Sequence, residues 1–305
     1  MIAIKQQRIK EISEQKANLD FIDNNRTIKI EDNSANNIKG IIFDFDGVIA
    51  SFDVRFGWPF FNALKKINPK VQPSKIVLTI LNLFKKMLEE RKIKGLEIIN
   101  FIMQIGRKIK LSKIKTIQLL LLFGIYYLKN KEKIVPIIGA REVIREIHKE
   151  GYKTVLITNS GRKTIEAATK KIPELGRFDL VITKDDVKYI KPNSMGFRNA
   201  LTKLNLNPRE VISIGDQVSD IIVGKKVGIK TIAFASYYEQ YLKKHLIEYH
   251  PDFILTDIRD LLNILQYLRC SENNLSDHTI DVSELIIKSE KETFSLESIC
   301  QISPN

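Results

Sequence analysis

Cysteine and tryptophan are scarce in this sequence, with 2 cysteines and 1 tryptophan among 305 residues. The cysteines, Cys270 and Cys300, lie near the C-terminus and belong to no cluster with metal-ligand spacing, so the sequence offers no cysteine-based metal site. The N-terminus is charged throughout and lacks the apolar block of a signal peptide. These features fit a reducing compartment, and we expect a cytoplasmic protein.

No apolar run in the sequence is long enough to cross a membrane. The run most worth testing, residues 117–128 (IQLLLLFGIYYL), has twelve residues, whereas a spanning helix needs roughly 20. We interpret it as a buried helix of a globular protein, with a segment at a membrane interface as the alternative. The hydrophobic fraction of 44% also indicates a globular rather than a disordered chain.

The positive charge is concentrated in one segment. Residues 53–135 contain 18 Lys and Arg but 5 Asp and Glu, which accounts for the whole net charge of +13. This segment shows helical periodicity and no good strand candidate, so we expect an inserted all-helical cap, here called the cap segment. Nucleic acid or an anionic surface could bind its charge, but without a basic stripe interleaved with aromatics a solvated lysine-rich face is favoured.

The rest of the chain alternates between short apolar runs and helical patterns. This alternation predicts an α/β fold with a doubly wound, Rossmann-like parallel sheet. Strands are expected at residues 38–43, 153–157, 180–182, 211–214 and 231–234, with helices at 140–150, 164–171, 194–204 and 220–227. A final strand and helix are expected within residues 250–265.

These signals divide the chain into four parts. Residues 39–52 and 136–268 would form the core, interrupted by the cap segment. Residues 1–38 indicate an N-terminal extension, helical to about residue 19 and then loop. Residues 269–305 form an acidic tail rich in Ser, Asn and Glu, which we expect to be disordered or loosely docked.

Four aspartates follow two of the expected strands. Asp44 and Asp46 come directly after the first strand, and Asp216 and Asp220 follow the fourth. Ligands of open parallel sheets bind beyond the carboxyl ends of the strands, so adjacent strands would bring these carboxylates together. Because the carboxylates would repel one another without a hard cation, we expect Mg²⁺ among them.

Other residues at or just beyond the strand ends favour an anion. Thr158 offers a hydroxyl, Asn159 and Ser160 precede a helix whose first N–H groups point outward, and Lys191 brings a positive charge. A phosphoryl group would fit between a cation, a lysine and backbone donors, beside a carboxylate that could attack phosphorus. Each motif is weak alone, and Asp-Phe-Asp-Gly lacks the spacing of a calcium loop. All four motifs in this order indicate one site.

This combination resembles the haloacid dehalogenase-like (HAD) superfamily over about residues 39–268. The four matching motifs are DFDGV at Asp44, the pair Thr158 and Asn159, Lys191 in KPN, and GDQVSD at Asp216 and Asp220. The phosphoglycolate-phosphatase-like branch is the most similar, because its helical cap also lies between the first two motifs. The 114 residues from Asp44 to Thr158 leave room for such a cap, whereas the 33 from Thr158 to Lys191 do not.

The resemblance implies a role for each motif residue. Asp44 would be the nucleophile that forms an aspartyl-phosphate, and Asp46 the general acid and base, with its backbone carbonyl on Mg²⁺. The remaining implied roles are phosphate binding by Thr158, Asn159 and Lys191, and metal binding by Asp44, Asp46, Asp216 and Asp220. Two departures are mild: Ser194 replaces a common second proline, and Gln217 stands where a small hydroxyl residue is frequent.

The second aspartate discriminates within the superfamily. Dehalogenases lack the equivalent of Asp46 and use no metal, and P-type ATPases carry threonine there. The resemblance therefore implies a Mg²⁺-dependent phosphatase acting on a small phosphorylated metabolite, whether phosphoglycolate-like, a sugar phosphate or a nucleotide. The alternatives are a phosphomutase of the same superfamily and a non-catalytic binding or regulatory protein that retains the fold.

The start of the cap segment supplies candidate substrate residues. In capped members of the superfamily, the cap closes over the site and selects the leaving group. Arg55, Trp58 and Phe60 follow the first motif closely, so they are candidates to gate the site or contact substrate. Packing within the cap is the alternative role for all three.

Overall fold

A computed structural model describes residues 38–71, 97–235 and 239–273 of the chain. These residues belong to one compact unit. The predicted N-terminal extension and most of the acidic tail lie outside the described residues, as does the middle of the cap segment. The division into core and cap therefore stays a prediction, and the architecture follows from the described ranges.

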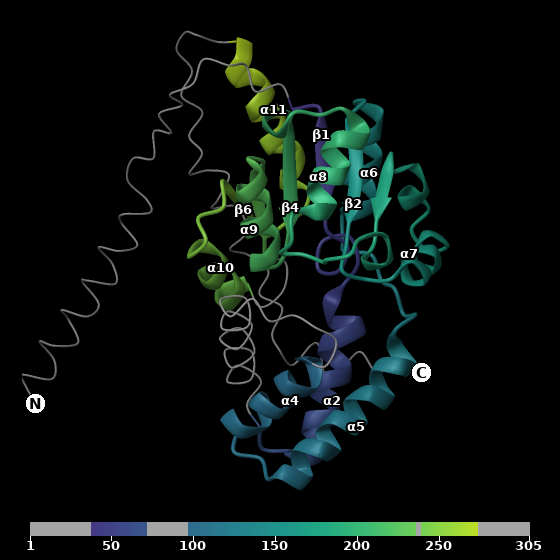
Figure 1. The fold of residues 1–305 in the computed structure, drawn as a ribbon, viewed down its shortest axis with the longest axis vertical. Helices are drawn as coiled ribbons and strands as arrows, with labels where there is room; N and C mark the ends of the chain where they lie inside the picture. Colours follow the sequence, from purple (N-terminus) through teal and green to yellow (C-terminus); the bar gives the residue numbers. More distant parts are fainter. Residues whose placement is uncertain (1–37, 72–96, 236–238, 274–305) are drawn as a thin grey trace, which may run out of the picture. The chain divides into compact units, whose positions relative to one another are not determined.

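A six-stranded parallel sheet carries the fold, in the strand order β3-β2-β1-β4-β5-β6 (Figure 1). The strands are β1 (Gly40–Phe43), β2 (Lys153–Ile157), β3 (Leu180–Ile182), β4 (Val211–Gly215), β5 (Lys230–Phe234) and β6 (Phe253–Leu255). The prediction of a doubly wound parallel sheet is confirmed. The first strand, β1, lies between β2 and β4, so two motif-bearing strands flank it directly.

Helices alternate with the strands along the chain. The helices are α2 (Trp58–Ile67), α4 (Glu97–Lys108), α5 (Lys113–Asn130), α6 (Ala140–Lys149), α7 (Arg162–Thr169), α8 (Met195–Leu204), α9 (Val218–Val227), α10 (Glu239–Ile247) and α11 (Asp260–Asn273). The sequence did not predict α10. The prediction also placed the start of α9 two residues too late, because Gln217 and Asp220 form a capping box at its N-terminus.

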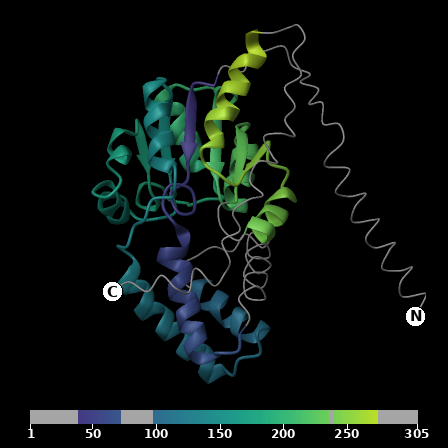
Figure 2. The same cartoon turned by 180° about the vertical axis from the view of Figure 1, so that it is seen from behind.

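The two faces of the sheet bury separate apolar clusters, as the period of two along a strand requires. Ile41 and Phe43 pack with residues of α6, α7 and α11, whereas Ile42 between them packs with residues of α8 and α9. Figure 1 shows α8 and α9 in front of the sheet, and Figure 2, from behind, shows α11 over the other face. All four residues of β1 are buried, which explains its uninterrupted apolar sequence.

The cap segment has an apolar cluster of its own. Its described helices, α2, α4 and α5, bury a shared set of side chains: Phe60, Ala63, Leu64, Ile102, Ile105, Leu119 and Phe123. These helices are preceded by a π-helical turn, η1 (Asp53–Gly57). A separate cluster means that the segment does not depend on the sheet for its internal packing.

The prediction of a buried helix at residues 117–128 is wrong for one of its faces. The run lies within α5, whose Leu119 and Phe123 are buried, but Leu121 and Leu128 are 61% and 62% exposed. The run is apolar on every side, and its neighbours cover only one side of it. Within the described ranges, no helix combines the length and apolar character that crossing a bilayer requires.

Two helical glycines of the cap segment provide a matched stability test. A Cβ at Gly106 would lie 2.3 Å from Thr116 Oγ1, whereas a Cβ at Gly124 would meet nothing within 4 Å. We expect Gly106→Ala to lower the free energy of unfolding by about 1–3 kcal/mol because α4 and α5 must separate. Gly124→Ala should raise it by about 0.5–1 kcal/mol through helix propensity alone. Urea titration of both variants checks this, and equal effects would contradict the close packing.

Candidate active site

The loop after β1 brings the first two aspartates to the sheet edge. The Asp44 N–H donates to the Ile214 carbonyl (3.0 Å), so pairing with β4 continues one residue beyond the strand. Gly47 then turns the chain with φ +85°, and a Cβ there would lie 2.0 Å from Asp216 Oδ2. Glycine is required by both the left-handed backbone and this close approach. The first motif therefore packs directly against the fourth.

The end of β4 places the other two aspartates opposite this loop. Asp216 is fully buried and follows the last residue of the strand, and Asp220 lies in the first turn of α9. The Oδ2 atom of Asp220 accepts a hydrogen bond from the Gln217 N–H (3.1 Å), which fixes its carboxylate. One carboxylate oxygen each from Asp44, Asp216 and Asp220 lie within 4.8 Å of one another. The structure thus brings together three of the four carboxylates that the sequence placed after two separate strands.

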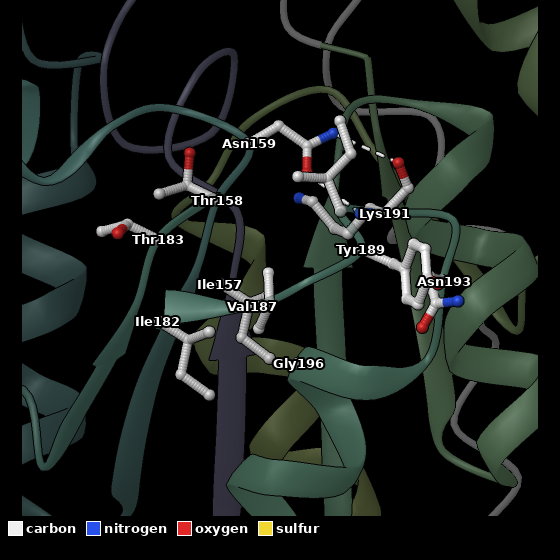
Figure 3. Close-up of a pocket in the computed structure, with 11 residues that line it drawn as sticks. Ile157, Thr158, Asn159, Ile182, Thr183, Val187, Tyr189, Lys191, Asn193 and Gly196 are labelled. Atoms are coloured by element: carbon white, nitrogen blue, oxygen red, sulfur yellow. Dashed lines mark hydrogen bonds between the residues drawn. The ribbon is translucent and has the colours of Figure 1, made fainter. Parts of the chain in front are cut away.

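Lys191 lies between two of these carboxylates. Its Nζ is 2.7 Å from Asp44 Oδ1 and 2.7 Å from Asp220 Oδ1, and its side chain is buried. The Asn159 side chain fixes the lysine backbone: it accepts from Lys191 N–H (3.1 Å) and donates to Lys191 C=O (3.3 Å) (Figure 3). Both ends of the Asn159 amide are therefore used to position Lys191.

Thr158 is buried at the end of β2, where its N–H donates to the Ile182 carbonyl (3.0 Å). Its Oγ1 accepts from the Ser160 N–H (2.9 Å). Thr158, Asn159 and Lys191 line a cavity of about 10 Å³, next to Thr183 and Gly196 (Figure 3). This cavity holds no more than a single water, so it is too small for a phosphoryl group.

Asp46 has two side-chain partners that the sequence analysis did not assign to it. Its Oδ1 forms an ion pair with the Arg55 guanidinium, and its Oδ2 accepts from Ser160 Oγ (2.6 Å). Its carboxylate is not part of the three-carboxylate group. Arg55 was predicted near the site, but Ser160 was named only as part of a helix start. The position of Ser160, two residues after the motif residue Thr158, is the sequence feature that could have indicated its place in the site.

Trp58 and Phe60 lie among aromatic neighbours in the cap segment. The Trp58 ring is 6.5 Å from that of Tyr126, and the buried Phe60 ring is 5.8 Å from that of Phe123. These contacts fit the packing role for both residues. In the described part of the chain, no hydrogen bond joins either residue to the aspartates, whereas Arg55 forms an ion pair with Asp46 of the first motif.

Burial sets the protonation of the site. Burial raises the pKa of the Asp44 carboxyl from 3.8 to about 7, although Lys191 acts in the opposite direction. Burial also raises the pKa of Asp46, with Arg55 and Ser160 opposing it. Burial would lower the pKa of Lys191, but Asp220 and Asp44 together raise it above its ordinary value. The Lys191 ammonium therefore pairs with two carboxylates of the buried group, those of Asp44 and Asp220.

The donor set fits a hard divalent cation. Three carboxylate oxygens converge, and this is the ligand type that Mg²⁺ prefers. Lys191 pairs with two of these carboxylates, and a divalent cation among the three would reduce their mutual repulsion. The residues that would hold such an ion are Asp44, Asp216 and Asp220.

The family follows from comparison with known proteins. Residues 41–234 match the model of the haloacid dehalogenase-like hydrolase family, a span that contains all four motifs. The chain belongs to the haloacid dehalogenase-like hydrolases. The resemblance inferred from the motifs is thereby confirmed.

Curated relatives in this hydrolase family match only in part. Pyrophosphatase PpaX from Bacillus cereus (strain G9842) is 36% identical over 132 residues, which are 43% of this chain and 59% of that protein. Pyrophosphatase PpaX from Bacillus mycoides (strain KBAB4) is 36% identical over 124 residues, 41% and 57% of the two chains. The chain thus spans less than two thirds of the length of these relatives.

Solved structures of HAD-like proteins share the fold. A predicted phosphoglycolate phosphatase from Haemophilus somnus 129PT aligns with TM-score 0.56 and 20% identity, over 74% of this chain and 97% of that one. A haloacid dehalogenase-like family protein from Streptococcus pneumoniae aligns with TM-score 0.54 and 19% identity, over 75% and 99%. At this identity the likeness establishes the fold.

The buried carboxyl of Asp53 in η1 predicts a pH effect on stability. Burial raises its pKa to about 6, whereas an unfolded aspartate titrates near pH 3.9. The native state therefore holds the proton more tightly, and this contribution to stability is lost as the pH rises from about 4 through 6. We expect Asp53→Asn to reduce the loss of stability between pH 4 and 7.5 by roughly 2 kcal/mol, measured by urea unfolding at both pH values.

Asp257→Asn provides the control for this experiment. Hydrogen bonds from Arg259 lower the pKa of Asp257, so this carboxylate does not destabilise the native state as the pH rises. The Asp257→Asn variant should therefore lose at least as much stability between pH 4 and 7.5 as the wild-type protein. A wild-type pH dependence retained in Asp53→Asn would contradict the assignment.

Proposed function

We propose that this chain is a Mg²⁺-dependent phosphatase that hydrolyses a small phosphomonoester through an aspartyl-phosphate on Asp44. The observation that carries the proposal is the meeting of Asp44, Asp216, Asp220 and Lys191 at the carboxyl ends of β1 and β4. Family membership supports a hydrolase. Bound Mg²⁺, held by the three carboxylates and the Asp46 carbonyl, would neutralise charge on the transferred phosphoryl group.

The position of Asp44 suits a nucleophile. Its Oδ1 accepts from the Phe45 N–H (2.7 Å) and pairs with Lys191. Its Oδ2 accepts no hydrogen bond from the described residues, which leaves that oxygen available to attack phosphorus. The attack forms the Asp44 acyl phosphate and breaks the bond between phosphorus and the ester oxygen.

Asp46 would move the protons in both halves of the reaction. It gives a proton to the leaving oxygen, and then takes one from the water that attacks the acyl phosphate. This second step releases inorganic phosphate and regenerates Asp44. Thr158 and Lys191 would hold phosphoryl oxygens, and Asn159 would act by fixing the Lys191 backbone.

Replacement of the nucleophile tests the chemistry. Asp44→Asn should lower phosphate release at least about 10³-fold, because the amide cannot form the acyl phosphate. The measurement is phosphate release from sugar phosphates, phosphoglycolate, pyrophosphate and nucleotides with Mg²⁺. The Asp257→Asn variant, changed at a carboxylate outside the site, should keep wild-type turnover.

Two outcomes of this screen would overturn the proposal. Exchange of the phosphate between positions of a sugar without net release would instead favour the phosphomutase. A lack of both release and exchange on the whole panel would favour a non-catalytic protein with the same fold.

Metal binding can be tested without turnover. Mg²⁺ at 100 times its dissociation constant should stabilise the wild-type protein by about 2.7 kcal/mol, seen as a rise in melting temperature. Asp216→Asn should abolish most of this rise because it removes one converging carboxylate. Asp257→Asn should retain it. A rise of equal size in Asp216→Asn would place the ion elsewhere.

A further inference from the structure

Arg55 is a buried arginine at the junction of the first motif and the cap segment. Its side chain is 1% exposed, and it lies in η1, nine residues after Asp46. The guanidinium carbon is 5.6 Å from the centre of the Phe45 ring and 5.1 Å from that of Phe56. Its one ion pair among the described residues is with Asp46. This arginine is therefore removed from water and committed to a single carboxylate.

Both oxygens of the Asp46 carboxylate are occupied in this arrangement. Arg55 takes Oδ1, and Ser160 Oγ donates to Oδ2 at 2.6 Å. A general acid must present an oxygen to the leaving group within hydrogen-bond reach. Asp46 must therefore release one partner before it can transfer a proton.

Release of Arg55 requires another anion. Breaking one side of a buried ion pair leaves an uncompensated charge, which is strongly unfavourable. The guanidinium also has unused capacity, because Arg55 Nε is buried and has no hydrogen-bond partner among the described residues. An anion bound beside Asp46 could pair with the positive charge of the Arg55 guanidinium and accept a hydrogen bond from its Nε. The planar guanidinium suits carboxylate and phosphate oxygens.

We propose that Arg55 forms an anion subsite for the leaving group, and that the substrate carries a carboxylate or second phosphate next to the oxygen that is protonated. The inference rests on the proposed phosphatase activity. As the substrate binds, the guanidinium exchanges the Asp46 carboxylate for the substrate anion. Asp46 Oδ1 is then free to serve the leaving oxygen. Esters without the second anion leave Arg55 on Asp46 and react slowly.

The test compares two matched esters. 2-Phosphoglycerate and glycerol 2-phosphate differ in one group on the carbon that bears the ester oxygen, a carboxylate in the first and a hydroxymethyl in the second, and pyrophosphate supplies the phosphate version of the anion. For the wild-type protein with Mg²⁺, we expect kcat/KM for 2-phosphoglycerate and pyrophosphate to exceed that for glycerol 2-phosphate at least about 30-fold. In Arg55→Gln the ratio should fall to within about threefold of one.

The ratio is internal to each variant, so a partly folded sample does not change it. Arg55→Lys keeps the charge without the planar fork and should give an intermediate ratio, which preserves the test if Arg55→Gln fails to fold. Arg269→Gln is the control, because this arginine pairs with Glu150 away from the aspartates and should keep the wild-type ratio.

The outcomes separate the two proposals. A ratio that is unchanged in active Arg55→Gln or Arg55→Lys would overturn the anion subsite and leave the phosphatase intact. A kcat/KM ratio near one for the wild-type protein would also overturn the anion subsite and leave the phosphatase intact. Wild-type protein that releases no phosphate from any ester would overturn the proposed function, and the subsite with it.

Discussion

A buried lysine held between two buried carboxylates is the interaction on which the site depends. Lys191 contacts Asp44 from β1 and Asp220 from α9, so one ammonium joins the first motif to the fourth. Without it, carboxylates from two strands would meet in a region that excludes water, where like charges repel strongly. Asn159 fixes the lysine backbone from a third strand end. The sheet therefore brings the carboxylates close together, and Lys191 reduces the repulsion between them.

The sequence was sufficient to predict the parallel sheet and the meeting of carboxylates at one of its edges. Apolar runs bounded by turns predicted a parallel sheet, and a parallel sheet gathers residues such as Asp44 and Asp216 because its strands all end at one edge. The partners of individual side chains were not predictable. Nothing in the spacing shows that Asn159 would hold the Lys191 backbone or that Ser160 would donate to Asp46, because both depend on the exact course of a loop. The same limit explains α5, since a run that is apolar on every side does not reveal which side its neighbours cover.

The cap segment and the sheet have separate apolar cores, and an ion pair connects the start of the cap segment to the first motif. The helices α2, α4 and α5 pack around their own cluster, which shares no residue with the clusters on the sheet. Arg55 is the first basic residue of the cap segment, and its partner Asp46 belongs to the first motif. In the proposed mechanism, recognition by the cap segment and proton transfer by the core would therefore involve the same pair of side chains.

The central position of β1 has a consequence for how the protein is made. Its first residue, Gly40, pairs with Lys153 and with Val211, which follow 113 and 171 positions later. At a translation rate of 5–20 residues per second, β1 leaves the ribosome roughly 10–30 s before its second neighbour is synthesised. The nascent chain therefore carries an apolar strand with at least one unpaired edge throughout that interval, and Asp44 meets Asp216 and Asp220 only after most of the polypeptide exists. Premature termination before β4 would yield a fragment with an aggregation-prone edge and without the group formed by Asp44, Asp216 and Asp220.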